Sequence, residues 1–250
     1  MIQDAGSKTM DPRSNIIDKR LARIKRIIAV SGGKGGIGKS LTASVLALTL
    51  SRLGHRVGLL DLDLSAPSMH VILGIEGVYP KEEKGIVPPE IYGIEFMSIV
   101  YFTGDNPSPL RGIDISNAML ELLAVTKWSS LDFLIVDTLP GIGDATMDII
   151  RWMKRAEFLV MATSSKVVLE TVKKVIKMLT ELNVPIIGVI ENMKMGKSSL
   201  VKEELKEFDV PFLGEMGFDD KIEDAIGEVD KLLESDFAAC IKGIVFSSFK

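Results

Sequence analysis

Short, mainly apolar runs recur along the chain and alternate with segments in which apolar residues return every three or four positions. Runs of this kind, without regular polar alternation, are typical of strands buried on both faces of a parallel sheet. The predicted strands are Ile27–Val30, Val57–Leu60, Ile94–Val100, Phe133–Val136, Phe158–Ala162 and Ile186–Ile190. Because strands and helices alternate, we expect an α/β fold with a doubly wound, mostly parallel sheet flanked by helices.

The intervening segments predict helices. They are Lys39–Leu53, Ser116–Lys127, Thr146–Arg155, Val167–Glu181, Lys197–Phe208 and Asp219–Leu233. The fourth has the clearest stripe, formed by Val168, Thr171, Val172, Val175, Met178 and Leu179, with Lys173, Lys174 and Lys177 outside it. This helix is therefore expected to lie on the sheet with its lysines in water.

Both ends of the chain and one internal segment depart from this pattern. Residues 1–14 are polar and predict a mobile arm, followed by a short helix from about Asn15 to Arg23. We therefore divide the chain into an N-terminal arm with its helix, residues 1–25, and a single domain, residues 26–250. Residues 75–91 are rich in proline, glycine and charge, which predicts an exposed loop or hairpin and a candidate partner surface.

Composition excludes several classes of protein. The 250 residues are 46% hydrophobic and carry a formal net charge of −4, which suits one α/β core and does not favour a nucleic-acid partner. The basic run Lys19–Arg26 is more typical of a solvated helix face. No apolar stretch suggests a signal peptide or a membrane span, so we expect a cytoplasmic protein without stable membrane anchoring. His55 and His70 have no other evident ligand nearby, which favours packing roles.

A glycine-rich segment, Gly33-Lys34-Gly35-Gly36-Ile37-Gly38-Lys39-Ser40, follows the first predicted strand and precedes a predicted helix. Backbone N–H groups of such a loop converge on phosphate, Lys39 reaches the β and γ phosphates, and Ser40 can hold Mg²⁺. The sequence therefore predicts a nucleoside triphosphate site. A flexible glycine loop is the alternative, and Lys34 could simply be solvated.

Asp137 directly follows a predicted strand. The carboxyl ends of strands in an open α/β sheet are where ligands bind, so this carboxylate is placed to hold a Mg²⁺-bound water. Asp61 and Asp63 follow another predicted strand and are further candidates for the same edge.

The loop resembles that of the Mrp/MinD group of deviant Walker A ATPases. The resemblance extends to Arg56–Asp63 with Ala66-Pro67-Ser68, to Leu134–Asp137 with Pro140-Gly141, and to Leu182–Pro185 and Glu191–Met193. It implies a slow, Mg²⁺-dependent ATPase that forms a homodimer whose geometry depends on ATP. It assigns Lys34 to the partner's phosphates, Asp63 to the attacking water, and Ser40, Asp61 and Asp137 to Mg²⁺.

ATP is favoured over GTP because the chain has Asn192 where related GTPases carry a guanine reader. A side-chain amide can pair with adenine, although Asn192 could instead only close a turn. The resemblance also places the segment from Pro211 to Leu213 beside the base. The expected nucleotide contacts are Gly33, Lys34, Gly35, Gly36, Ile37, Gly38, Lys39, Ser40, Leu41, Asn192, Pro211, Phe212 and Leu213.

One departure from the family pattern bears on function. Mrp-type iron–sulfur carriers place a Cys-x-x-Cys pair after the Glu-Asn-Met segment, but residues 194–199 contain no cysteine, and Cys240 is the only one in the chain. Cluster carriage by the usual route is therefore not expected.

Among relatives without the pair, the chain most resembles the archaeal ATPase-type HypB factors. That resemblance implies nickel insertion during hydrogenase maturation, with the nickel chaperone HypA as partner. An iron–sulfur carrier with atypical ligands and a MinD-like organiser that cycles on a membrane remain alternatives. The C-terminal tail has only Lys242 and Lys250 as cations, so we expect it to pack on the body.

Overall fold

A central sheet organises the molecule in the computed structural model, which describes residues 11–64, 66–103, 113–197 and 200–249. Within these residues the strand order is β10-β9-β8-β1-β7-β2-β6-β5, and only the edge strand β5 is antiparallel to its neighbour. The strands are β1 Ile24–Gly32, β2 Val57–Asp61, β5 Glu90–Ile91, β6 Ile94–Ser98, β7 Leu131–Asp137, β8 Ala156–Ala162, β9 Ile186–Lys194 and β10 Phe212–Gly217. The predicted doubly wound α/β fold is confirmed.

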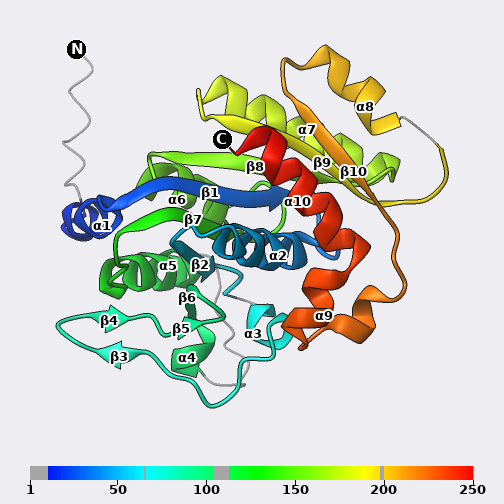
Figure 1. Ribbon diagram of the computed structural model, residues 1–250. Coiled ribbons are helices and arrows are strands. Elements are labelled where there is room, and N and C mark those ends of the chain that lie inside the picture. Colours follow the sequence, from blue (N-terminus) through cyan, green and yellow to red (C-terminus); the bar gives the residue numbers. More distant parts are fainter. Residues whose placement is uncertain (1–10, 65, 104–112, 198–199, 250) are drawn as a thin grey trace, which may run out of the picture.

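Helices cover both faces of the sheet (Figure 1). The longer helices are α1 Arg13–Leu21, α2 Lys39–Arg52, α5 Ile113–Val125, α6 Asp144–Trp152, α7 Lys166–Glu181 and α10 Asp236–Ser248. Helix α2 lies against β1, β2 and β7, while α7 contacts β1, β8 and β9 from the opposite face. The shorter helices are α3 Met69–Ile72, α4 Val100–Thr103, α8 Leu200–Glu204 and α9 Val229–Glu234. All six predicted strands are present because their apolar runs are buried between these layers, although β6 ends at Ser98 and Val100, predicted as its last residue, begins α4.

Helix α7 confirms most of the predicted stripe, with Val168, Val172, Val175 and Leu179 buried. One of its lysines is not in open water as expected. Lys173 forms ion pairs with Glu204 of α8 and with Glu207, and its side chain is only 19% exposed. The prediction failed because periodicity cannot show that an acidic segment folds back over this helix.

The predicted helix Asp219–Leu233 is wrong as a continuous element. The chain forms a 3₁₀ turn, Ile222–Ala225, and then the separate helix α9. Gly227, with φ of 84°, separates them, and its carbonyl lies only 2.3 Å from where a Cβ on Gly74 would be. Close packing of two backbones therefore interrupts the helix.

The remaining expectations concern the ends and the hairpin. The N-terminal helix is present as α1, and the arm before it, residues 1–10, lies outside the described residues. Residues 75–91 include an antiparallel hairpin of β3 Lys81–Glu82 and β4 Ile86–Val87. The C-terminal tail packs on the body as expected, since α10 contacts α2 and β10 and buries most of its apolar side chains, with Phe246 as an exposed exception. No helix among the described residues is both long enough and apolar enough to cross a membrane.

Candidate nucleotide and magnesium site

The glycine-rich loop joins β1 to α2 at the carboxyl edge of the sheet. Gly36 and Gly38 have φ of 73° and 84°, a region that favours glycine. A Cβ on Gly38 would lie 2.3 Å from the side-chain nitrogen of Asn192, whereas one on Gly35 or Gly36 would have no described atom within 4 Å. The loop is therefore tightly held on its inner side and open on its outer side, where an anion could approach the backbone amides.

Two cations flank this loop in different environments. Lys39 begins α2 and is only 6% exposed, and its charge acts on the Asp137 carboxylate. Lys34 is exposed, as is required of a side chain that has to reach a second subunit. The structure is thus compatible with the two roles expected for these lysines, which remain predictions.

Asp61 and Asp137 lie side by side at the ends of β2 and β7, where they are paired in register. Both are almost completely buried. The Ser40 hydroxyl donates to Asp137, whose Oδ1 has no hydrogen-bond partner among the described residues. An unpartnered buried carboxylate oxygen beside a hydroxyl, a second carboxylate and a phosphate loop is a donor set suited to Mg²⁺. The residues present therefore fit a Mg²⁺–nucleotide.

Burial perturbs both carboxyl groups. It raises the pKa of Asp61 to about 8, with the neighbouring charge of Asp137 as the next cause. It also raises the pKa of Asp137 to about 6, although the Ser40 hydrogen bond and the Lys39 charge oppose this shift. At neutral pH the ligand-free pair therefore holds about one proton, mainly on Asp61, and a cation placed between the two groups would favour the ionisation of both.

Asp63 lies in the loop after β2 and is half-buried. Its N–H donates to Asp61 Oδ1 at 3.1 Å, and its own Oδ1 accepts from the Ala66 N–H at 3.1 Å. These bonds fix the loop next to the buried pair. Orientation of the attacking water by Asp63 stays a prediction.

Asn192 lies directly beneath the phosphate loop at the end of β9. It is 3% exposed, and its side-chain Nδ2 donates to the Ile37 carbonyl at 3.0 Å. The amide therefore supports the loop from inside. Its expected contact with adenine stays a prediction.

The segment from Pro211 to Leu213 is not brought to the loop. Strand β10 runs parallel to β9, so Phe212, beside Val189, marks its amino end and Gly217, beside Lys194, its carboxyl end. Only the carboxyl end shares an edge with the phosphate loop. A cavity of about 390 Å³ opens at that end, and its lining includes Gly217, Phe218 and Cys240. Residues 216–218 are thus better placed for a nucleotide base than residues 211–213.

Three polar residues at this edge were missed from the sequence. Ser98, at the end of β6, donates to Asp61 Oδ2 at 3.3 Å, and Thr138 donates to the Val30 carbonyl at 3.0 Å. Glu191 is fully buried, and neither carboxylate oxygen has a partner within the described part of the chain. Burial raises the pKa of Glu191. Ser98 gave no signal comparable to that of Asp137, because in the sequence it lies inside the apolar run 94–100 and only the structure ends the strand there.

The loop after Asp137 is joined to the phosphate loop. The Gly141 N–H donates to the Gly32 carbonyl at 3.0 Å, and the Thr146 hydroxyl donates to the Gly141 carbonyl at 3.1 Å. Ile142, between these contacts, is 43% exposed. A change at the phosphates could therefore be transmitted to this surface loop.

The chain matches the model of one protein family over residues 23–245, a model described as ParA, NUBPL iron-transfer P-loop NTPase. It belongs to this family. The resemblance to Mrp-type P-loop NTPases is thereby confirmed.

Curated relatives carry related names. An "Iron-sulfur cluster carrier protein" of Pseudomonas fragi is 43% identical over 69% of this chain and 62% of its own length. One of Rickettsia conorii is 34% identical over 88% of this chain and 69% of its own length. A chloroplastic Fe-S cluster assembly factor of Arabidopsis thaliana is 32% identical over 88% of this chain. The match spans less than two thirds of the Pseudomonas protein and 49% of one from Aquifex aeolicus.

Solved structures agree with the fold. A nucleotide-binding protein of Archaeoglobus fulgidus, in complex with ADP, has a TM-score of 0.72 and 25% identity over 93% of each chain. MinD of Pyrococcus horikoshii, complexed with Mg-ADP, has a TM-score of 0.65 at 20% identity, covering 89% of this chain and 95% of its own. At 20% identity, the similarity to MinD shows only that the two proteins share a fold.

These findings overturn the nickel hypothesis. The family model and the relatives are named for iron transfer and iron–sulfur clusters, so the inferred HypB likeness and the role in hydrogenase maturation are wrong. Nothing supports HypA as the partner. The missing Cys-x-x-Cys pair concerns one short segment, whereas the similarity to the iron-transfer family extends over residues 23–245.

Proposed function

We propose that this protein is an ATP-hydrolysing switch in iron–sulfur cluster transfer. The observation that carries the proposal is the joint placement of Lys39, Ser40, Asp61 and Asp137 around an open amide loop. The family match and the names of the relatives support iron–sulfur clusters as the cargo.

In this proposal the phosphate loop binds the triphosphate through its backbone amides, and buried Lys39 neutralises charge on the transferred phosphoryl group. Ser40, Asp61 and Asp137 would hold Mg²⁺, which when bound neutralises further phosphate charge. Asp63 positions the attacking water, and Lys34 of each subunit reaches the nucleotide of the other. Hydrolysis then changes the loop around Gly141 and with it the geometry of the dimer.

An iron–sulfur cluster needs cysteine ligands, and this chain has one cysteine, Cys240, instead of a Cys-x-x-Cys pair. Cys240 lies half-buried in α10, and burial, with the nearby Asp236 charge, raises the pKa of its thiol. Iron–sulfur clusters are held by thiolates, so this environment disfavours Cys240 as a ligand. We therefore infer that cluster ligands come from the donor or acceptor protein and that this chain supplies the ATP-driven change of shape.

Cluster transfer between two other proteins tests the proposal. The cluster-loaded Pseudomonas fragi carrier is mixed anaerobically with apoferredoxin, and holoferredoxin is followed by visible circular dichroism. We expect this protein with Mg-ATP to accelerate transfer, Cys240→Ser to act like the native chain, and Lys39→Ala to be inactive. Equal transfer rates with and without the native chain and Mg-ATP would refute the proposed role.

A further inference from the structure

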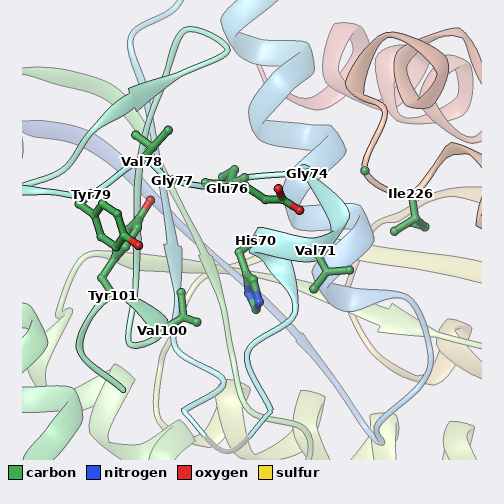
Figure 2. Close-up of a pocket in the computed structure, with 12 residues that line it drawn as sticks. His70, Val71, Gly74, Glu76, Gly77, Val78, Tyr79, Val100, Tyr101 and Ile226 are labelled. Carbon is green, nitrogen blue, oxygen red and sulfur yellow. The ribbon is translucent and has the colours of Figure 1, made fainter. Parts of the chain in front are cut away.

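A second cavity, of about 730 Å³, has no residue of the phosphate loop among its described lining residues, several of which are drawn in Figure 2. It is bounded by α3, the segment 74–79, the start of α4 and the turn at Gly227. Its volume is within the range of small-molecule sites. Apolar side chains form much of its wall, namely Val71, Ile75, Val78, Val100 and Ile226.

Two polar atoms of the lining have no partner. His70 Nδ1 and the Tyr101 hydroxyl are both buried from solvent, and neither makes a hydrogen bond within the described part of the protein. Each such atom costs about 1–3 kcal/mol unless something satisfies it. The Tyr101 ring is held edge-on by Phe96 at a centroid distance of 5.8 Å, so its hydroxyl is fixed in place. Neither atom is accessible, so both lie behind the cavity surface, whose exposed part is formed by the other side chains of the lining.

The charged residues of the lining determine whether a positively or a negatively charged ligand would bind. Glu76 is the one carboxylate among the described lining residues, and no lysine or arginine is among them. Tyr79 and Tyr101 add two aromatic rings from the other side of the cavity (Figure 2). A carboxylate and aromatic faces together favour an organic cation and disfavour an anion.

The walls of this cavity are tied to the candidate magnesium site. The Met69 N–H, in the first turn of α3, donates to the Asp61 carboxylate, and His70 is the next residue. On the other wall, Ser98 Oγ donates to Asp61 Oδ2 at 3.3 Å and accepts from the Val100 N–H at 3.3 Å. Both polar walls are therefore linked to one carboxylate through hydrogen bonds.

We propose that this cavity binds a small organic cation, an ammonium group on an apolar body, and that the nucleotide state changes its affinity through Asp61. The ammonium lies at the Glu76 carboxylate, and the apolar body lies against Val71 and Val100. The coupling to nucleotide rests on the function proposed above, whereas the binding itself does not.

Fluorine NMR of a matched pair of probes tests the site. The probes are para-fluorophenethylammonium and the neutral, similarly sized para-fluorophenylpropanamide. We expect the cation to bind about tenfold more tightly than the amide. Glu76→Gln should remove this preference, while Glu90→Gln, a change outside the cavity, should keep it. Failure of the cation to bind, or equal affinity of the two probes for the native chain, would overturn the site.

The same titrations with no nucleotide, Mg-ADP and a non-hydrolysable Mg-ATP analogue test the coupling. We expect the affinity for the cation to differ about fivefold between states, and Ser98→Ala, which cuts the link to α4, to reduce that difference. Equal affinity in all states, in protein that binds a fluorescent ATP analogue, would refute the coupling. If that analogue does not bind, the proposed function fails, and the titration without nucleotide still tests the cavity.

Discussion

Replacing Asp61 by asparagine should stabilise the ligand-free protein at neutral pH. The pKa of Asp61 rises from 3.8 to about 8 on folding, so the native state holds a proton that the unfolded chain releases between these values. The free energy of unfolding therefore falls as the pH rises through this window. Integrating the shift gives a loss of about 4 kcal/mol at pH 7 relative to acid conditions.

Asparagine resembles the protonated carboxyl but does not titrate, so Asp61→Asn avoids this loss. The rearranged hydrogen bond from Ser98 costs about 1 kcal/mol, which leaves a net gain of about 3 kcal/mol at pH 7 and almost none near pH 4. Urea unfolding at the two pH values, without Mg²⁺ or nucleotide, measures this difference. The matched control is Asp63→Asn, because Asp63 is only half-buried.

Two results would refute the reasoning. One is an Asp61→Asn protein no more stable than the native chain at neutral pH, and the other is an unchanged pH dependence. The same variant should also lose most of the stabilisation that Mg-ATP gives the native chain, since the amide carries no charge for the cation. If Asp61→Asn kept that stabilisation, Asp61 would not be a ligand of Mg²⁺.

The remaining predictions concern the phosphate loop and the attacking water. Lys39→Ala should weaken ATP binding roughly a hundredfold, because a buried phosphate partner is lost, and calorimetry would measure it. Asp63→Ala should leave ATP binding intact, slow hydrolysis at least about a hundredfold and let an ATP-bound homodimer accumulate. A monomer in light scattering of this variant with ATP would contradict the proposed homodimer. Gly38→Ala should cost about 1–3 kcal/mol in thermal unfolding, since its Cβ meets the Asn192 amide at 2.3 Å, whereas Gly35→Ala should be tolerated.

The hydrophobic pattern located the buried strands but not the edge strand β10. Each central strand is sandwiched between helices, so nearly every position must be apolar and the run is visible in the sequence. Strand β10 has one strand neighbour, contains Gly214 and the exposed Glu215, and therefore lacks such a run. Its position decides which end shares an edge with the phosphate loop, and no pattern in the sequence shows that residues 211–213 lie at the other end.

The sequence by itself determined the fold class, the phosphate loop and the strand-end position of Asp137, because these follow from local order along the chain. Only the tertiary structure decided which residues meet in space. The strand register places Asp61 beside Asp137, and burial raises the pKa values of both. The same packing forms the cavity that His70 and Tyr101 help to line. These properties depend on distances between segments remote in sequence. Such distances are fixed by how helices pack on the sheet, which no single stretch of residues encodes.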